Sequence, residues 1–172
     1  MEIKTKRLTL RPIGMADLET QYAYTSDYEN TKYMMFLPDE SIEETKAFLK
    51  RVEVEWKKEK PAVYEFAILY ENTHVGGVGI DFLDEGKTAE FGWSLNKKYW
   101  RKGICYEAAA AVLEYAVNQL GIKHFIAHCD SENAASYKVM EKLGMKRVDC
   151  YGGRKNKGSD EERMELRYEM WV

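Results

Sequence analysis

Apolar and polar residues alternate along several segments in the first 95 positions of the chain, as in strands that bury one face. This alternation predicts strands at 2–12, 62–70, 74–83 and 88–95. The connections at 71–72 and 84–86 carry turn residues, so the last three strands should form an antiparallel meander. A short helix is expected at 17–24. Ser41 and Glu44 match a capping box and predict an amphipathic helix that runs to about Lys58.

The spacing of apolar residues changes to a helical one after residue 103. A helix is predicted over 104–120, and Gly121 should end it. One face of this helix carries a stripe of residues that should be buried: Ile104, Ala108, Val112, Tyr115 and Ala116. A buried strand (122–129), a second helix (133–143) and two final strands (145–151 and 162–171) should follow. The order of elements predicts an α/β (α+β) fold in one domain, 1–172, with a mixed central sheet of about seven strands and flanking helices.

Composition narrows the class of protein. Apolar residues make up 45% of the chain and aromatic residues 13%, enough for a real core, and the formal net charge of −3 argues against a nucleic-acid partner. No apolar run approaches the ~20 residues that cross a bilayer, so no membrane partner is expected. Cys105, Cys129 and Cys150 are odd in number and lack metal-ligand spacing, which favours a reducing compartment, hence the cytoplasm, and no metal site.

The segment 99–108, YWRKGICYEA, carries the strongest functional signal. It joins a predicted strand to the start of an Ala-rich helix through a polar loop that contains Gly103. The first amides of a helix lack internal partners, and the helix dipole adds positive charge there. Lys97, Lys98, Arg101 and Lys102 surround the same turn. The loop therefore predicts a site for a phosphorylated ligand, although it is neither a Walker A loop nor a dinucleotide fingerprint.

This loop and the later segment 130–145, DSENAASYKVMEKLGM, resemble the motifs of GNAT-type N-acetyltransferases, and the RimJ/RimL-like branch in particular. The resemblance covers essentially the whole chain, from TKRLTLRP near the N-terminus to the last strand. It implies a GNAT-like fold and acetyl-CoA as acetyl donor, with CoA as product. The acceptor it implies is a primary amine, on a protein or peptide N-terminus or on a small molecule, and a homodimer is a family-level expectation.

Three positions depart from the family pattern. Trp100 stands where the phosphate loop usually has Gln or Arg, and Cys105 stands at its last, small position. Met140 occupies the place of a Tyr that serves many relatives as general acid, and Met cannot transfer a proton. Ser136 lies three residues after Asn133, as in RimJ/RimL-like members.

The resemblance implies a set of cofactor-binding residues along the strand, the loop and the second helix: Trp93, Ser94, Leu95, Trp100, Arg101, Lys102, Gly103, Ile104, Cys105, Asn133 and Ser136. Asn133, Ser136 and Met140 share one helix face. Asn133 can bond the pantetheine arm, or simply cap the helix. Ser136 is a candidate acid for the leaving thiolate, or a solvated surface residue.

Glu90 is the candidate general base, acting directly or through water, because the resemblance places its strand beside the thioester. Asp81 is a second carboxylate candidate, and an exposed strand position without a catalytic role is the alternative for Glu90. Direct attack of the amine in a ternary complex would need no cysteine nucleophile, so Cys129 and Cys105 are interpreted as small core residues.

Other residues are interpreted as structural. His124 and His128 should be satisfied strand histidines, and Arg154, Lys155 and Lys157 should form a solvated loop. The aromatic segment 28–38 fits either an acceptor pocket or core packing. Two rival functions stay open: a non-catalytic CoA-binding sensor or partner-binding module, favoured by Met140, and a generic nucleotide-binding domain.

Overall fold

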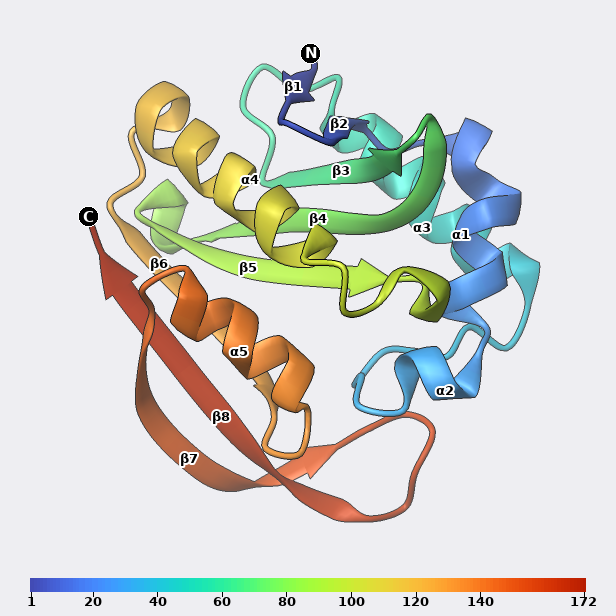
Figure 1. Ribbon diagram of the computed structural model, residues 1–172, viewed down its shortest axis with the longest axis vertical. Helices are drawn as coiled ribbons and strands as arrows, with labels where there is room; N and C mark the ends of the chain where they lie inside the picture. Colours follow the sequence, from blue (N-terminus) through green and yellow to red (C-terminus); the bar gives the residue numbers. More distant parts are fainter.

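An eight-stranded mixed sheet runs through the computed structural model, which describes residues 1–172 (Figure 1). The strands follow the order β1-β2-β3-β4-β5-β6-β8-β7. Their bounds are Ile3–Lys4 (β1), Leu8–Pro12 (β2), Val63–Tyr70 (β3), Thr73–Leu83 (β4), Thr88–Leu95 (β5), His124–Asp130 (β6), Lys146–Lys155 (β7) and Glu162–Trp171 (β8). All neighbours pair antiparallel except β5 and β6, which are parallel because α4 crosses between them.

Helices cover both faces of this sheet. Their bounds are Leu18–Thr25 (α1), Tyr28–Thr31 (α2), Ile42–Glu55 (α3), Ile104–Leu120 (α4) and Ala134–Lys142 (α5). In Figure 1, α4 and α5 lie on one face, and α1 and α3 lie on the other, over β3 and β4. The sheet therefore has an α4 face and an α3 face, and only part of the α3 face is covered by helices.

The predicted meander and the crossover helix are confirmed, and the sheet has one strand more than expected. The segment 2–12 is divided into β1 and β2 by a turn at Thr5–Arg7. The amide of Leu8 donates to Thr5 Oγ1 (2.9 Å), and that hydroxyl donates to Glu107 Oε1 (2.6 Å). A local side-chain hydrogen bond of this kind competes with continuous pairing, which the alternation alone does not reveal.

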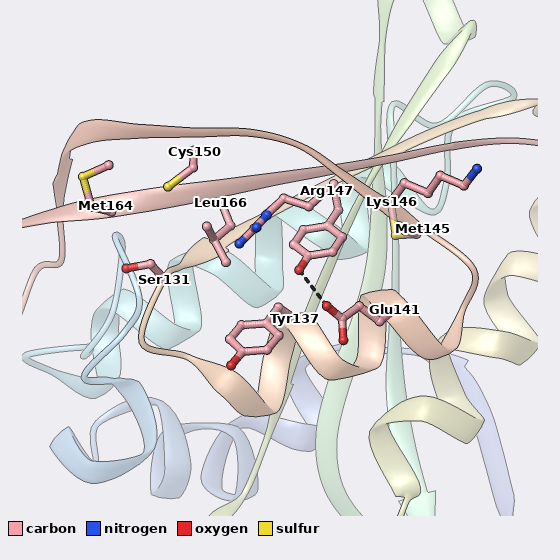
Figure 2. Close-up of a pocket in the computed structure, with 10 residues that line it drawn as sticks. Ser131, Tyr137, Glu141, Met145, Lys146, Arg147, Cys150, Met164 and Leu166 are labelled. Carbon is pink, nitrogen blue, oxygen red and sulfur yellow. Dashed lines mark hydrogen bonds between the residues drawn. The ribbon is translucent and has the colours of Figure 1, made fainter.

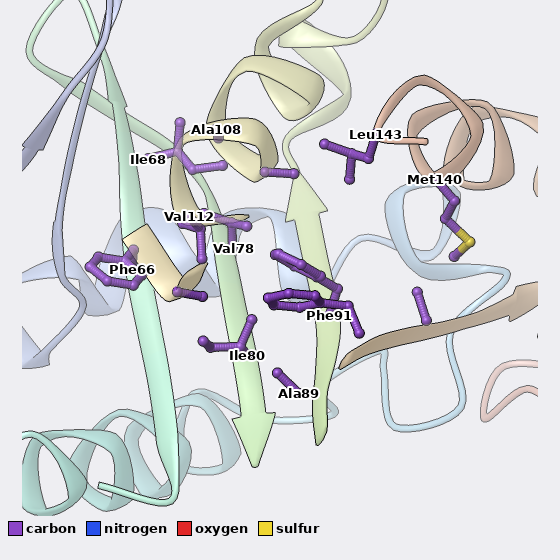
Figure 3. Packing of buried hydrophobic residues seen from close by; sticks show 14 of the residues in the cluster. Phe66, Ile68, Val78, Ile80, Ala89, Phe91, Ala108, Val112, Met140 and Leu143 are labelled. Carbon is purple, nitrogen blue, oxygen red and sulfur yellow. The ribbon is translucent and has the colours of Figure 1, made fainter. Parts of the chain in front are cut away.

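The core lies between α4 and the central strands. Ile104, Ala108, Val112 and Ala116 are fully buried against β3, β4 and β5, as the helical stripe predicts (Figure 3). Tyr115, the fifth member of the stripe, is half-buried and packs against Phe66. Burying this stripe holds the first turn of α4 at a fixed place above β5, which positions the predicted phosphate loop.

Two local predictions are wrong. Ser41 makes no side-chain capping bond, and the Glu44 amide donates to the Ser41 carbonyl instead. The Glu44 carboxylate accepts from the Glu40 amide and from Lys157 Nζ (3.0 Å). Arg154 is buried and is not part of a solvated loop. Its guanidinium donates to Glu165, to Asn156 and to the Tyr33 carbonyl, at 2.8–2.9 Å. These hydrogen bonds and the carboxylate of Glu165 offset the cost of burying the Arg154 charge. The basic run 154–157 is therefore partly structural.

Candidate active site

The parallel strands β5 and β6 separate halfway along their length. They pair only from Thr88–His124 to Phe91–Ala127, so the last four residues of β5 have no partner on the β6 side. Cys129 and Asp130 continue on β6 and pair only with β8. A strand edge that opens inside a sheet leaves backbone N–H and C=O groups available to an extended ligand. Trp93, Ser94 and Leu95, predicted to bind the cofactor, line this opening.

One backbone group of the opening is already engaged. The carbonyl of Leu95 accepts from Trp100 Nε1 at 2.7 Å and from Asn30 Nδ2 at 2.8 Å. Asn30 is buried and also accepts from the Lys97 amide at 2.8 Å. The indole of Trp100 therefore fixes the loop to the end of β5, which explains how Trp can stand at a position where the family usually has Gln or Arg. Because the Leu95 carbonyl already accepts two hydrogen bonds, it is not available to a ligand.

The loop before α4 has the backbone conformation of an anion site. Arg101 and Gly103 both have positive φ, at 62° and 74°, and Gly103 is the N-cap of the helix. The amide of Glu107 is the first to bond within the helix, to the Gly103 carbonyl. The amides of Ile104, Cys105 and Tyr106 thus remain without a helical acceptor. Alternating left-handed residues before such a turn direct successive N–H groups toward one point, where an anion can bind.

Side chains around this loop play unequal parts. Ile104 is completely buried, so only its amide can reach a ligand. Lys97 is ion-paired with Asp27 (2.7 Å) on the side of α2. Lys102 lies with its Nζ 5.2 Å from the Tyr99 ring centroid. Of the four cations singled out in the sequence, Lys97 is therefore ion-paired with a residue at the start of α2. Arg101 contributes its positive φ to the loop as well as its charge.

Arg7 is a positioning residue that the sequence did not indicate. Its Nη1 donates to the Lys102 carbonyl at 3.0 Å, and its Nε donates to Glu107 Oε2 at 2.7 Å. The guanidinium thereby holds one carbonyl of the loop and the first turn of α4 together. No local pattern connects Arg7 with residues about a hundred positions later, so only the folded chain reveals this contact.

The start of α5 faces the same opening from the α4 face. Asn133 is the N-cap, and its Oδ1 accepts from the Ser136 amide (3.2 Å), so the capping interpretation is correct. Its Nδ2 forms no hydrogen bond within the chain and stays available for a ligand. Ser136 is half-buried next to Cys129, which lies on the part of β6 that does not pair with β5. Met140 is fully buried in the core and lies out of reach of any ligand (Figure 3).

Cys129 and Cys105 behave as core thiols. Burial raises the pKa of Cys129 to about 11, although Arg154 and a hydrogen bond with Ser136 act in the opposite direction. Burial raises the pKa of Cys105 to about 12. Both groups are therefore protonated at neutral pH, and neither has the thiolate character of a nucleophile.

These pKa values predict the reactivity of the three thiols. At pH 8 a thiol reagent should modify one equivalent rapidly, at exposed Cys150, and should modify the other two at least about 100-fold more slowly. Unfolding in denaturant should release three equivalents, and Cys150→Ser should abolish the fast phase. Two fast equivalents in the folded protein would contradict the assignment.

Glu90 lies on the α3 face of β5, at the point where the two strands begin to separate. Its Oε1 is 2.7 Å from Nδ1 of His128, and both side chains are partly exposed, 34% and 21%. Asp81 is directly opposite Glu90 on β4. Partial burial and the charge of Glu90 raise the pKa of Asp81. The structure thus brings together the two carboxylates singled out in the sequence and adds His128, which was interpreted as structural.

His124 lies on the same face of β6 as His128, but at a point where β6 pairs with both β5 and β8. It contacts Thr88 (2.9 Å) and Glu169 (2.7 Å), and its ring stacks on Trp171 with centroids 4.0 Å apart. This histidine has all of its partners within the chain. No group of three or more His, Cys, Asp or Glu side chains is arranged to hold a metal ion. No helix combines the length and apolarity needed to cross a membrane.

A cavity of about 760 Å³ lies elsewhere, between α5 and the β7–β8 ribbon (Figure 2). Tyr137 and Glu141 of α5 face Arg147 and Leu166 there, and Glu141 accepts from Tyr168 at 3.0 Å. None of the predicted cofactor-binding or catalytic residues lines this cavity. This cavity is therefore separate from the opening between β5 and β6, where the predicted residues lie.

Comparison with known proteins identifies the family of this chain. The family model described as an acetyltransferase (GNAT) domain matches residues 7–146. The chain therefore belongs to the GNAT acetyltransferase family. It is an acetyl-CoA-dependent N-acetyltransferase, and the resemblance seen in the sequence is confirmed.

Individual relatives agree with this assignment. A Bacillus subtilis (strain 168) protein named as the N-acetyltransferase YnaD is 34% identical over 149 residues, 86% of this chain and 84% of that protein. A Bacillus anthracis GNAT-family acetyltransferase superposes with a TM-score of 0.85 and 31% identity, covering 99% of this chain and 98% of the other. RimL, a ribosomal α-N-protein acetyltransferase in complex with coenzyme A, shares the fold, with a TM-score of 0.87, 16% identity and coverage of 100% and 98%.

Proposed function

We propose that this acetyltransferase transfers the acetyl group directly to a primary amine at the opening between β5 and β6. The observation that carries this proposal is the Glu90–His128 pair, which lies beside the point where the strands separate. Bound acetyl-CoA supplies the activated acetyl group. The chain supplies a place for its diphosphate, a strand edge for its arm, and groups that move protons at the reacting end.

The residues present fit the cofactor. The unpartnered amides of Ile104 and Cys105, with left-handed Gly103 before them, form the diphosphate site. The open edge of β5 at Trp93 and Ser94 takes the extended pantetheine arm, and Asn133 Nδ2 donates to it from the other side. Arg101 and Lys102 add positive charge at the mouth of the loop.

The Glu90–His128 pair accepts the proton of the incoming ammonium. An ionised carboxylate can only accept a hydrogen bond, so the shared hydrogen lies on Nδ1 of His128. In the neutral ring Nε2 then keeps its lone pair. Either Glu90, directly or through water, or His128 can therefore take the proton that must leave before the amine attacks. On the opposite face of the sheet, the Ser136 hydroxyl can donate a proton to the leaving sulfur.

Ser136 and Asn133 are tested by paired substitutions. Ser136→Ala should lower kcat by about 10- to 1,000-fold if its hydroxyl is the acid. Asn133→Ala should raise the KM for acetyl-CoA and also weaken the start of α5, whereas Asn133→Asp keeps the cap and removes the donor. Wild-type turnover in Ser136→Ala, in an assay where product release is not limiting, would leave thiolate protonation to water.

Direct transfer is tested by initial rates measured at varied acetyl-CoA and amine concentrations, with the amine that supports the fastest thiol release. Attack within a ternary complex predicts intersecting double-reciprocal lines, and these should persist in Cys129→Ala, because the buried thiol takes no part. Parallel lines, together with an acetylated cysteine in the intact protein by mass spectrometry, would contradict the proposal.

A further inference from the structure

The turn between β1 and β2 reaches across to the loop that precedes α4. Arg7, in this turn, donates from Nη1 to the Lys102 carbonyl at 3.0 Å, and no other group of the chain donates to that carbonyl. A Cβ built at Gly103 would lie 3.5 Å from Arg7 Nη2, so the guanidinium lies against the N-cap of α4. The segment TKRLTLRP, singled out in the sequence, therefore contacts the predicted diphosphate loop.

A single carboxylate holds Arg7 in this place. Glu107 Oε2 accepts from Arg7 Nε at 2.7 Å, and Glu107 Oε1 accepts from the Arg7 amide at 3.0 Å and from Thr5 Oγ1 at 2.6 Å. Partial burial acts to raise the pKa of Glu107, but the hydrogen bonds from Thr5 and Arg7 outweigh it, so the pKa is lowered. Three donors on one ionised carboxylate form a network, which holds its geometry better than an isolated surface ion pair.

The bond to the Lys102 carbonyl fixes the orientation of one peptide unit. The C=O and N–H groups of a trans peptide point in opposite directions, so the Gly103 N–H is held on the side of the loop away from Arg7. Rotation of this peptide would reverse both groups and change the sign of φ at Gly103, which is 74°. Glycine adopts positive and negative φ about equally well, so Gly103 does not itself select either orientation. The contact of the Lys102 carbonyl decides between them.

We propose that Arg7 sets the affinity for acetyl-CoA, because it holds the peptide between Lys102 and Gly103 in the orientation that receives the diphosphate. The inference rests on the proposed function, which places the diphosphate at the amides of Ile104 and Cys105. In the reversed orientation the Lys102 carbonyl replaces an N–H on the side of the anion, and its partial negative charge repels phosphate. When only a fraction of the molecules has the competent orientation, the apparent Kd rises by the inverse of that fraction.

Arg7→Met tests this role, because it keeps the apolar length of the side chain and removes the guanidinium. The Kd for acetyl-CoA should rise about 10-fold, the factor expected for one lost hydrogen bond to a charged group. The KM for acetyl-CoA should rise with it, and kcat at saturation should stay within about twofold of wild type, since only binding is affected. Isothermal titration measures Kd, and thiol release at varied acetyl-CoA measures KM and kcat.

Arg11→Met is the matched control, because it removes the other arginine of the same segment. Arg11 Nη2 is 2.6 Å from Asp17 Oδ1, at the start of α1. Breaking this pair leaves a buried carboxylate without its partner, so the melting temperature should fall at least as far as in Arg7→Met. The Kd for acetyl-CoA should not change in this control. Equal rises in Kd in the two variants would indicate general destabilisation and would overturn the inference.

Glu107→Gln provides a test in which the direction of the effect decides. Glu107 places a negative charge in the first turn of α4, so its removal should strengthen binding of an anion there if charge alone mattered. If the carboxylate acts by holding Arg7, the Kd for acetyl-CoA should instead rise about 3- to 10-fold, because a glutamine NH2 cannot accept from Arg7 Nε. Arg7→Met should then add little to Glu107→Gln. Tighter binding in Glu107→Gln, or fully additive losses, would contradict the inference.

A truncated cofactor separates positioning from direct contact. Dephospho-CoA lacks the phosphate on the ribose but keeps the diphosphate, so Arg7→Met should weaken its binding by the same factor as that of CoA. A loss confined to CoA would show that Arg7 binds the ribose phosphate itself, and the positioning role would be wrong.

Gly103→Pro distinguishes failure of this inference from failure of the proposed function. If Gly103→Pro loses affinity while Arg7→Met keeps the wild-type Kd, the loop binds the diphosphate without help from Arg7, and only the inference fails. If folded Gly103→Pro also keeps the wild-type Kd, the diphosphate binds elsewhere, and the proposed cofactor site fails as well.

Discussion

Glu90→Gln is expected to lower kcat at pH 7 by about 100- to 10,000-fold, the range that a lost general base produces. An alkylamine with a pKa near ~10.4 is almost entirely protonated at that pH, so some group must accept its proton before attack. Glutamine keeps the shape of the side chain and its contact with His128 but cannot take the proton. The variant should recover part of its rate as pH rises, because more of the amine is then neutral. Steady-state thiol release from pH 6 to 10 measures this recovery.

Glu169→Gln provides the matched control for this change. Glu169 contacts His124 at 2.7 Å, the same separation as Glu90 and His128, but lies where β6 is paired on both sides. If the rate fell only because a carboxylate–histidine contact was weakened, Glu169→Gln and Glu90→Gln would lower kcat by similar factors. We expect only Glu90→Gln to lower kcat. If Glu90→Gln keeps the wild-type rate and pH profile, Glu90 is structural, and His128, Asp81 or water is the proton acceptor.

Gly103→Pro is expected to raise the Kd for acetyl-CoA at least about 100-fold, from the ~3 kcal/mol of a misplaced proline and the loss of one donor. Gly103 has a φ of 74°, whereas proline fixes φ near −65°. The change removes the amide N–H of Gly103, beside the diphosphate site, and redirects the amides of Ile104 and Cys105 that form it. Isothermal titration with acetyl-CoA measures the affinity, and circular dichroism establishes that the variant is folded.

An alanine pair separates strain from binding. Gly103→Ala and Gly121→Ala place the same side chain at φ 74° and 71°, at the two ends of α4. Both should lose roughly 1–2 kcal/mol of stability, the cost of a left-handed residue. Only Gly103→Ala should also weaken acetyl-CoA binding, because Gly121 is remote from the site. Undiminished affinity in folded Gly103→Pro would show that the diphosphate binds elsewhere.

The fold was largely predictable because its elements have strong local signals. The α4 stripe, Gly121 at its end and the alternation in β3 to β5 each determine structure over a few neighbouring residues. The break between β1 and β2 was missed because it depends on Glu107, about a hundred positions away. Arg154 was misplaced for the same reason, since its partner, the Tyr33 carbonyl, comes from a distant segment.

The parts of the candidate site that depend on local backbone conformation were predictable from the sequence. Gly103 before an Ala-rich helix predicts an anion loop from sequence, and its left-handed conformation is compatible with that prediction. Asn133 is a helix cap, which is one of the two roles that the sequence allowed, and its role toward the cofactor stays a prediction. By contrast, the Glu90–His128 contact joins two parallel strands that are separated by a crossover helix. This relation leaves no trace in sequence spacing.

The most direct test of the account is a panel of primary amines, with thiol release and the mass of the acetylated product measured together. The panel includes diamines, monoamines, aminoglycosides and short peptides with free N-termini. The account predicts that at least one amine is acetylated in a one-to-one ratio with released CoA, and that Glu90→Gln lowers both signals by the same factor at pH 7. Tight binding of acetyl-CoA with no acetylated amine, and thiol release no faster than hydrolysis, would contradict it.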